Sequence, residues 1–528
     1  FIQSSRFNPT HEGLKTMISR IVNVLVLVTV ACAVRVHNND QEDFLLERKK
    51  LRRRLQQQNP VDSPEGHRVA SLPLADPLPF DLYSGHLKAS PDGDKKFFYW
   101  LVAPEDPVVR ASPNTPILIW LNGGPGCSSS DGFFLENGPL MFEQQADKKY
   151  KLVSNPNSWH MAPAWVLYVD QPVGTGLSIT HSGNYPKNDE EVNVDFHFFM
   201  EEFLIFFGDF FLTEDRSEAN NPIFFSGESH AGHYIPSMMD YILSNAAQAR
   251  VKMILGGAAI GNGWIDPFHQ YAATDLAYSM GMINLSQKAH LDEQEKSCQK
   301  LLKSGELNTM ACFSLLDTVV DQSHGASAPT HVSMYDARNV ERKGMPRIFP
   351  VGHGLVESYL AGDALGVDHS VVLQAIHATE TIEVNQKYRE CADPPYEALK
   401  HQDGLGVVPQ LTSLLENNVR VLFYNGMHDL VCNHIGTEKA LMKLPWSQIN
   451  EWSLAPRFTW SIGKDLPPAA YVHEFQNLAY LKIPNAGHMV PQDQPEVALR
   501  MMQTFLHGES FKQYQQYLDR NSQVEKSC

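Results

Sequence analysis

NPIFFSGESHAGHYIP, residues 221–236, places Ser229 two residues after Gly227 and two residues before an alanine–glycine pair. The stretch opens with aromatic and β-branched residues, which predict a short buried strand, and it continues into a segment of helical length. Small residues around the serine suit a sharp turn, where backbone segments come close together. We therefore predict a strand, a turn that exposes Ser229, and a helix. The alternative is an ordinary glycine-rich loop.

The segments around this turn alternate between strand and helix patterns. Short apolar runs that end in Gly, Pro, Asn or Asp predict buried strands at 116–121, 164–169, 222–227, 251–264, 420–426 and 478–487. Three longer segments have the length and residue pattern of helices, at 192–211, 230–246 and 494–506. Buried strands that alternate with helices predict an α/β protein, with a mostly parallel central sheet that is flanked by helices.

A serine on a strand–turn–helix unit is the nucleophile elbow of the α/β-hydrolase fold. Its hydroxyl needs a base, the base needs an orienting acid, and in this fold the acid and then a histidine follow the serine along the chain. Asp429 comes just after the strand predicted at 420–426, and His488 lies in a turn that follows the strand predicted at 478–487. Because the chain has 22 histidines, one histidine in a turn is weak evidence by itself. The order along the chain and the placement after predicted strands together predict the triad Ser229, Asp429 and His488.

Acyl transfer also requires donors for a developing oxyanion. The sequence WLNGGPGCSSS (120–130) follows the first predicted strand, and its Gly123 and Gly124 can turn their N–H groups toward such an oxygen. The N–H of His230, directly after the serine, is the second donor expected at a nucleophile elbow. These groups need neither a metal nor a cofactor.

Seven ordered motifs resemble those of the serine carboxypeptidases. They are WLNGGPGCSS (120–129), NPNSWH (155–160), YVDQPVGTGLS (168–178), FFSGESHAGHYIP (224–236), GNGWIDP (261–267), NGMHDLVCN (425–433) and NAGHMVP (485–491). The likeness runs from about Val69 to Leu506. It implies an α/β-hydrolase fold and release of C-terminal residues from peptides and proteins through an acyl-enzyme. In that chemistry Ser229 is the nucleophile, and the backbones of Gly124 and His230 form the oxyanion hole.

The resemblance also implies a site for the carboxylate at the substrate's C-terminus. In this family the glutamate beside the serine holds that carboxylate together with the NGG stretch. Here the residues are Asn122, Gly123 and Glu228, with Trp120 alongside and Glu136 as a second, paired glutamate. Because two carboxylates at hydrogen-bond distance share a proton, we expect activity to be highest in acid.

Further residues match family positions. The resemblance implies a substrate-pocket Met489, a free Cys432 near the site, and disulfides Cys127–Cys391 and Cys298–Cys312; the cysteine count alone leaves fifteen pairings open for six cysteines. Three positions depart from the family pattern: His230 replaces a usual tyrosine, Met427 an acidic residue and His86 an aromatic one. Only the backbone of His230 is needed for the chemistry.

The N-terminal part has the composition of a targeting segment. From Met17, the chain carries Arg20, an apolar run and the small-residue pattern Ala31–Cys32–Ala33, which predict a signal peptide at 17–33 after an upstream extension at 1–16. The alternative is a membrane anchor, for which the apolar run is short. Residues 34–66 contain a basic cluster and predict a propeptide or a solvated segment. We expect a secreted or a vacuolar or lysosomal protein, with an N-glycosylation site at Asn284.

The remaining boundaries follow from changes in pattern. We predict a hydrolase core at 67–265 and 401–515, a mainly helical cap insertion at 266–400 and a tail at 516–528. The net charge of −17 argues against nucleic acid as a partner. The predicted partners are peptide or protein C-termini, without stable membrane insertion, and a homodimer is compatible with the sequence.

Two other functions compete with the carboxypeptidase. Acyltransferases on the same scaffold typically carry Asp at the position of Glu228, so the glutamate favours the peptidase. A non-catalytic protective or binding protein would not need the intact triad. The sequence does not predict which C-terminal residue the carboxypeptidase removes.

Overall fold

The computed structural model describes residues 63–325, 327–343, 353–362, 365–463 and 466–512. The predicted signal peptide, almost all of the predicted propeptide and the predicted tail lie outside these residues. Contacts divide the chain into two units, 1–66 and 67–528. Apart from the bounds of η2 (Pro64–His67), the description below concerns the second unit.

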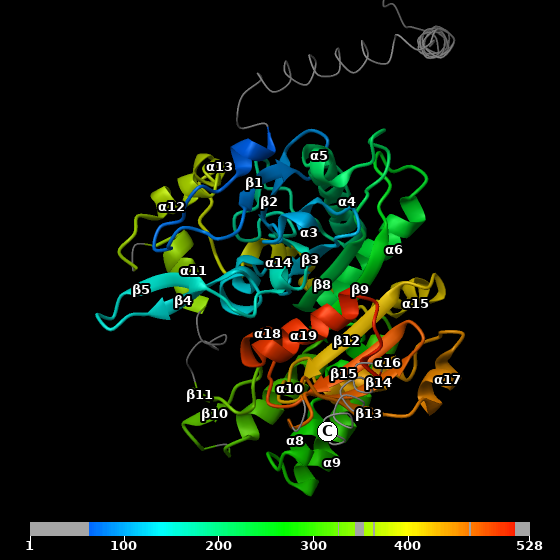
Figure 1. Cartoon of the computed structure of the whole chain (residues 1–528). Coiled ribbons are helices and arrows are strands. Elements are labelled where there is room, and N and C mark those ends of the chain that lie inside the picture. Colours follow the sequence, from blue (N-terminus) through cyan, green and yellow to red (C-terminus); the bar gives the residue numbers. More distant parts are fainter. Residues whose placement is uncertain (1–62, 326, 344–352, 363–364, 464–465, 513–528) are drawn as a thin grey trace, which may run out of the picture. The chain divides into compact units, whose positions relative to one another are not determined.

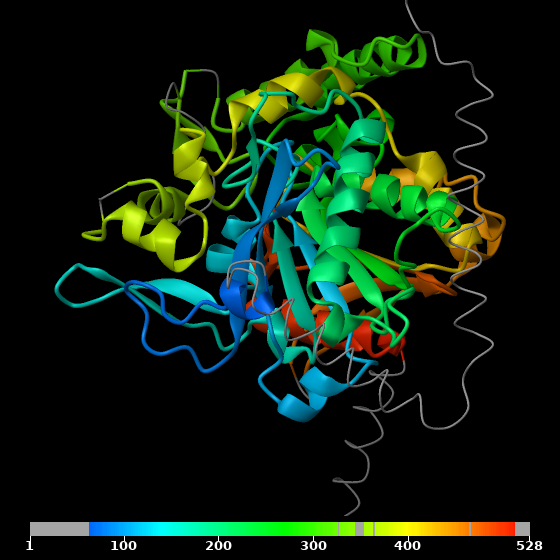
Figure 2. The ribbon, with the colours of Figure 1, turned by 90° about the horizontal axis from the view of Figure 1, so that it is seen from above.

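An eleven-stranded sheet runs through this unit (Figures 1 and 2). Its order is β1 (Leu82–Lys88), β2 (Lys95–Val102), β6 (Trp165–Val169), β3 (Ile117–Leu121), β8 (Ile223–Ser229), β9 (Leu255–Gly263), β12 (Arg420–Gly426), β15 (Leu478–Ile483), β14 (Ala470–Phe475) and β13 (Phe458–Trp460), with β7 (Ile179–Thr180) beside β2. The six strands from β6 to β15 are parallel, whereas the strands at both edges pair antiparallel. The predicted parallel sheet is thus confirmed, and each of its predicted strands is present.

The central strands are apolar throughout because both faces of the sheet are covered. In β3 all five side chains are buried, and they alternate between two cores. Ile117, Ile119 and Leu121 belong to one core, which also contains residues of α4 (Asp189–Phe206), α6 (Ala231–Asn245) and α15 (Val408–Glu416). Leu118 and Trp120 belong to the other, which contains residues of α11 (His353–Leu360) and α19 (Pro495–Leu506).

Helix α4 begins at a strong N-terminal cap. The side chain of Asn188 accepts a hydrogen bond from the backbone N–H of Glu191, and three acidic residues occupy the first turn, where they favour the positive end of the helix dipole. The sequence predicts helix as far as residue 211. The structure instead ends α4 at Phe206 and, after Phe207, begins the short α5 (Gly208–Phe211).

The insertion predicted at 266–400 is mainly helical. It contains α7 (Pro267–Gln270), α8 (Thr274–Ser279), α9 (Leu285–Lys303), α10 (Met310–Gln322), β10 (Thr330–Val332), β11 (Val340–Arg342), α11, α12 (His369–Ala375), α13 (Glu380–Glu383) and α14 (Asp393–Leu399). The disulfide Cys298–Cys312 joins α9 to α10, as the resemblance implies. Asn284 of the glycosylation sequon is exposed and caps α9 through its side-chain oxygen.

The remaining elements are short and lie in the connections. They are η2 (Pro64–His67), α3 (Pro107–Ala111), η3 (Gly132–Glu136), β4 (Leu140–Gln144), β5 (Tyr150–Ser154), η4 (Trp159–Met161), η5 (Lys400–Gln402), α16 (His434–Leu441), α17 (Ile449–Leu454) and α18 (Val490–Asp493). Strands β4 and β5 form a hairpin apart from the main sheet. Within the described ranges, no helix combines the length and apolarity that a membrane span requires.

Candidate active site

Ser229 stands at the junction of β8 and α6, with a positive φ of 61°. Only small neighbours permit this bend. A Cβ atom on Gly227 would lie 2.2 Å from the carbonyl oxygen of Leu121, and one on Gly232 would lie 2.6 Å from the Cα of Gly263. The strand–turn–helix prediction is therefore correct, and the alternative of a glycine-rich loop is wrong.

Asp429 and His488 are brought together from loops that follow β12 and β15. His488 Nδ1 lies 2.8 Å from Asp429 Oδ2, and Asp429 is fully buried. Because Nδ1 faces the carboxylate, Nε2 is the nitrogen left for a nucleophile. Ser229 and His488 both line one small cavity of about 90 Å³, which we call the central cavity.

Asn262 holds Asp429 from the end of β9, and the sequence analysis did not find it. Its Nδ2 donates to Asp429 Oδ2 at 2.7 Å, while its Oδ1 accepts the N–H of Gly426 at 2.9 Å. Asp429 also accepts the backbone N–H of Val431 at 2.9 Å. The signal in the sequence that could have identified Asn262 is an asparagine between two glycines in GNGW. In the structure this residue has a φ of 40°, a conformation that few residue types adopt. Met427, which departs from the family, donates its backbone N–H to Ile483.

Gly123 lies directly against the elbow. A Cβ atom there would be 2.5 Å from the backbone nitrogen of His230 and 2.7 Å from Ser229 Cβ. Only glycine permits this approach, and the next residue, Gly124, has a φ of 111° that also favours glycine. Gly124 and His230 also line a common cavity with Ser229. The two residues predicted to donate to an oxyanion thus line the same cavity as the serine.

Asp170 fixes the loop that carries these glycines. This buried carboxylate, from YVDQPVG, accepts the hydroxyl of Ser128 at 2.6 Å and the backbone N–H groups of Ser129 at 2.9 Å and Leu177 at 2.9 Å. Burial is the main cause that raises the pKa of Asp170, to about 6, against the lowering effect of those hydrogen bonds. The same loop is tied to the insertion by the disulfide Cys127–Cys391, as the resemblance implies.

Two buried glutamates meet beside the serine. Asn122 Nδ2 lies 3.2 Å from Glu136 Oε1 and 3.3 Å from Glu228 Oε1, and its Oδ1 accepts the indole N–H of Trp120 at 2.7 Å. Burial, followed by the charge of Glu136 and a hydrogen bond with it, raises the pKa of Glu228 well above its usual range. Three of the five residues that the resemblance assigns to carboxylate binding, Asn122, Gly123 and Glu228, line the central cavity. The other two, Trp120 and Glu136, contact Asn122.

Cys432 is a free, buried thiol next to the triad. Its sulfur and one ligand atom each of Asp429 and His488 lie within 4.8 Å of one another, the one such metal-sized group in the described part of the chain. Burial and the nearby carboxylates raise the pKa of the Cys432 thiol well above its usual range, so it stays protonated. A neutral thiol is a poor metal ligand, and Asp429 is already engaged, so these residues do not fit a metal site.

His230 and His86, the two histidines that depart from the family pattern, lie in different surroundings. His230 stacks on His233, with ring centroids 5.1 Å apart. Burial, then the charge of His233, lowers the pKa of His230 to about 3. His86 is buried in β1, where its Nε2 lies 2.7 Å from the carbonyl oxygen of Leu177. It is not among the described residues that line the cavities next to Ser229.

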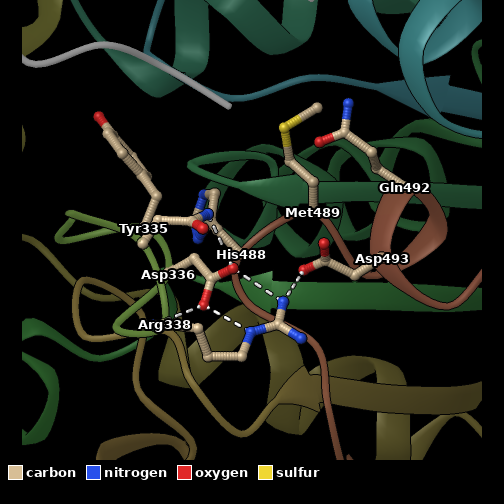
Figure 3. Close-up of a pocket in the computed structure, with 8 residues that line it drawn as sticks. Tyr335, Asp336, Arg338, His488, Met489, Gln492 and Asp493 are labelled. Carbon is tan, nitrogen blue, oxygen red and sulfur yellow. Dashed lines mark hydrogen bonds and ion pairs between the residues drawn. The ribbon is translucent and has the colours of Figure 1, made fainter. Parts of the chain in front are cut away.

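Two larger cavities flank the central one. The Met489 cavity, about 550 Å³, is lined by His488, Met489, Tyr335 and Gln492. Figure 3 shows the guanidinium of Arg338 between the carboxylates of Asp336 and Asp493, each at 2.8 Å. The Trp264 cavity, about 330 Å³, is lined by Gly124, Ser229, His230, Trp264 and residues of the insertion.

Comparisons with known proteins agree with one another. Residues 73–508 match the family model described as "Serine carboxypeptidase". The chain is 36% identical over 465 residues to "Serine carboxypeptidase S10 family member 2" of Dictyostelium discoideum, covering 86% of this chain and 78% of that protein. It is 32% identical over 448 residues to "Pheromone-processing carboxypeptidase KEX1" of Phytophthora infestans, covering 84% and 72%.

A solved structure gives the same result at the level of the fold. The prohormone-processing carboxypeptidase Kex1(delta)p from Saccharomyces cerevisiae superposes with a TM-score of 0.72 and 26% identity, over 84% of this chain and 96% of that one.

Proposed function

Because the chain belongs to the serine carboxypeptidase family and is a serine-type carboxypeptidase of the α/β-hydrolase fold, we propose which of its residues carry the reaction. Ser229 is the nucleophile, His488 the general base and acid, and Asp429 the group that orients and stabilises the imidazole. The 2.8 Å contact between His488 Nδ1 and Asp429 supports this assignment.

The first half of the reaction forms the acyl-enzyme. Ser229 Oγ attacks the carbonyl carbon of the last peptide bond and passes its proton to His488 Nε2. The carbonyl oxygen becomes an oxyanion, which the N–H groups of Gly124 and His230 stabilise. When the tetrahedral intermediate collapses, the carbon–nitrogen bond breaks, and His488 gives the proton to the departing amine.

The second half returns the enzyme to its starting state. A water molecule takes the place of the released amino acid and gives a proton to His488 while its oxygen attacks the ester carbonyl. The bond to Ser229 Oγ then breaks, and His488 returns the proton to the serine. The shortened peptide leaves with a new C-terminal carboxyl group.

The pair Glu228–Glu136 carries the exopeptidase part of the proposal. Buried together at Asn122, the two carboxyls favour a shared proton, which a protonated Glu228 can donate to a substrate carboxylate. Asn122 and Gly123 would supply the other donors. A site built in this way accepts only a chain end, because an internal peptide offers no carboxylate and leaves these buried groups without a partner.

The Met489 cavity adjoins the central cavity on the leaving-group side, since both include Tyr335, His488 and Met489. We infer that it receives the side chain of the residue that is removed. Its floor already contains the paired charges of Arg338, Asp336 and Asp493 (Figure 3).

A secretory route is the compartment that best fits the chain. The two disulfides, Cys127–Cys391 and Cys298–Cys312, form and persist in oxidising compartments. The names of the relatives describe processing of pheromone and prohormone peptides. We propose that this chain likewise trims peptide C-termini along that route, as a secreted or a vacuolar or lysosomal enzyme.

One experiment tests the proposal directly. A peptide with a free C-terminus and the same peptide with a C-terminal amide are incubated with the enzyme, and the products are read by mass spectrometry. We expect a ladder of successive C-terminal losses from the first peptide and none from the second. Internal cleavage of the amidated peptide would overturn the exopeptidase assignment. Transfer of an acyl group to an added alcohol, without peptide trimming, would favour the acyltransferase.

A further inference from the structure

One loop of the insertion, residues 333–339 between β10 and β11, contacts the loop that carries Asp429. The carbonyl oxygen of Met334 accepts the backbone N–H groups of Leu430 at 3.0 Å and of Val431 at 3.2 Å. These two residues directly follow Asp429 in the chain. The insertion therefore helps to hold the turn of the proposed acid, which the core strands alone do not complete.

The same loop contacts the turn that carries His488. The carbonyl oxygen of Tyr335 accepts the backbone N–H of His488 at 2.8 Å, and the two rings meet edge-on with centroids 5.3 Å apart. Gly487 comes so close to the loop that an added Cβ would lie 2.7 Å from the carbonyl oxygen of Tyr335 and 2.7 Å from the Cβ of Asp336. The proposed base therefore packs directly on the insertion.

Arg338 ties this turn to the loop through its side chain (Figure 3). Its guanidinium donates to both carboxylate oxygens of Asp336, at 2.8 Å each, and to Asp493 at 2.8 Å. It also donates to the backbone oxygen of Asn485. Asp493 in turn accepts the N–H of Gly487 at 2.7 Å. The arginine thus holds both ends of the three residues that precede the proposed base, one end directly and the other through Asp493.

These contacts are more specific than those of an exposed ion pair, which contributes little and tolerates loose geometry. Asp336 is buried, and the side chain of Arg338 is 35% exposed. All three side-chain nitrogens of Arg338 donate, to acceptors on three different residues. A lysine has one nitrogen at the end of a flexible stem and could not make these contacts at once.

We propose that Arg338 is a positioning residue, which sets the orientation of His488 by fixing the turn before it to the insertion. This inference rests on the proposed function. His488 transfers a proton when the acyl-enzyme forms and again when water releases it, so a misplaced turn should slow both half-reactions. A residue that only shaped the Met489 cavity would act on the leaving amino acid, which has departed before the second half begins.

The two half-reactions can be measured separately. Trimming of an N-blocked peptide that ends in glycine reports acylation without a leaving side chain in the Met489 cavity. Turnover of the p-nitrophenyl ester of the same acyl group, after its burst, reports deacylation. We expect Arg338→Ala to lower both rates about tenfold or more. The KM for the glycine peptide should stay within about twofold.

The matched control is Arg216→Ala. This substitution removes another arginine that pairs with an aspartate, since Arg216 lies 2.8 Å from Asp209 of α5, and both side chains are half exposed. We expect it to change neither half-reaction, because the pair has no contact with the turn of His488.

Two further measurements separate positioning from general damage to the fold. Guanidinium chloride at millimolar concentration should restore part of the activity of Arg338→Ala, because Arg338 lines the Met489 cavity, where a free ion can take its place. Sodium chloride at the same concentration should not. Asp493→Asn keeps an oxygen for the N–H of Gly487 and loses the charge that pairs with Arg338. It should slow both half-reactions several-fold, even if Arg338→Ala does not fold.

The possible results separate this proposal from the proposed function. If Arg338→Ala and Asp493→Asn deacylate within about twofold of the wild-type rate, or if the two salts act alike on Arg338→Ala, the positioning role is wrong and the proposed function stands. The same holds if only peptides with a bulky last residue are slowed. If the wild type trims no peptide with a free C-terminus, the proposed function itself fails.

Discussion

Asn262 donates a hydrogen bond of 2.7 Å to the carboxylate of Asp429. The same oxygen of Asp429, Oδ2, lies 2.8 Å from His488 Nδ1. The asparagine comes from the end of β9, the aspartate follows β12 and the histidine follows β15. The orientation of the proposed base is therefore set by three neighbouring parallel strands.

Substitution of Asn262 should lower turnover without weakening substrate binding. In Asn262→Asp the donor to Asp429 is replaced by a like charge, so the carboxylate moves or takes up a proton and orients His488 less well. We expect kcat to fall about 10–100-fold with KM nearly unchanged, measured on a free-acid peptide. Asn485→Asp makes the same change at an exposed positive-φ position after β15 and should have no effect. A rise in KM at unchanged kcat would contradict the positioning role.

Removal of any triad member should abolish most of the activity. Ser229→Ala, Asp429→Asn and His488→Ala should each reduce kcat by about 10⁴-fold or more, because the three residues act as a unit. Steady-state assays with folded variants, checked by circular dichroism, measure this. A fluorophosphonate probe should label the wild type and not Ser229→Ala; labelling that persists in this variant would assign the nucleophile elsewhere, and the absence of labelling in the wild type would support a non-catalytic protein.

Substrate binding should weaken as pH rises. The pKa of Glu228 is raised by burial and by Glu136, so below that pKa the carboxyl is protonated and can donate to the substrate carboxylate. Above it the proton leaves, and two negative charges face each other. We expect KM of the wild type to rise from acid toward neutral pH.

Glu228→Gln provides the matched test, because its amide can donate at every pH. The variant should keep a nearly flat KM over the interval in which that of the wild type climbs. If both KM values climb together, Glu228 does not sense the carboxylate.

Gly227 should tolerate no side chain. An added Cβ would lie 2.2 Å from the carbonyl oxygen of Leu121 and 2.8 Å from Ala231 Cβ, so the elbow must shift. We expect Gly227→Ala to lower the free energy of unfolding by about 2 kcal/mol, measured by denaturant titration, and to reduce activity. Gly354→Ala in α11 is the control, since nothing lies within 4 Å of the added atom. Equal stability of the two variants would contradict the close packing of the elbow.

The parallel strands could be predicted because each is a short, continuous apolar run. The edge strand β1 could not be predicted in this way. Its buried residues include Ser84, Gly85 and His86, which are not typical of the interior of a strand. The buried Ser84 hydroxyl is acceptable there because a partner from elsewhere in the chain satisfies it: it donates to the carbonyl oxygen of Ile376 at 2.8 Å. Such long-range pairs leave no local pattern.

At the site, chain order located the proposed triad, and family resemblance located the glutamate pair and both disulfides. Asn262 was missed because its role depends on the spatial neighbour Asp429, 167 residues away. The Trp264 cavity was missed for a similar reason. Its lining residues come from the loop after β3, the turn after β8, the segment after β9, α10, α14 and the loop after β12, among others. No periodicity within one segment describes a space between so many.

The hydrolase core is interrupted by the insertion, and this has a consequence for biosynthesis. Ser229 is synthesised about two hundred residues before Asp429 and still longer before His488. The loop of Gly124 is joined, through Cys127, to a cysteine 264 positions downstream. A chain broken off anywhere in the insertion therefore contains the proposed nucleophile and lacks both the proposed acid and the proposed base. Such a fragment has no group in place to activate Ser229.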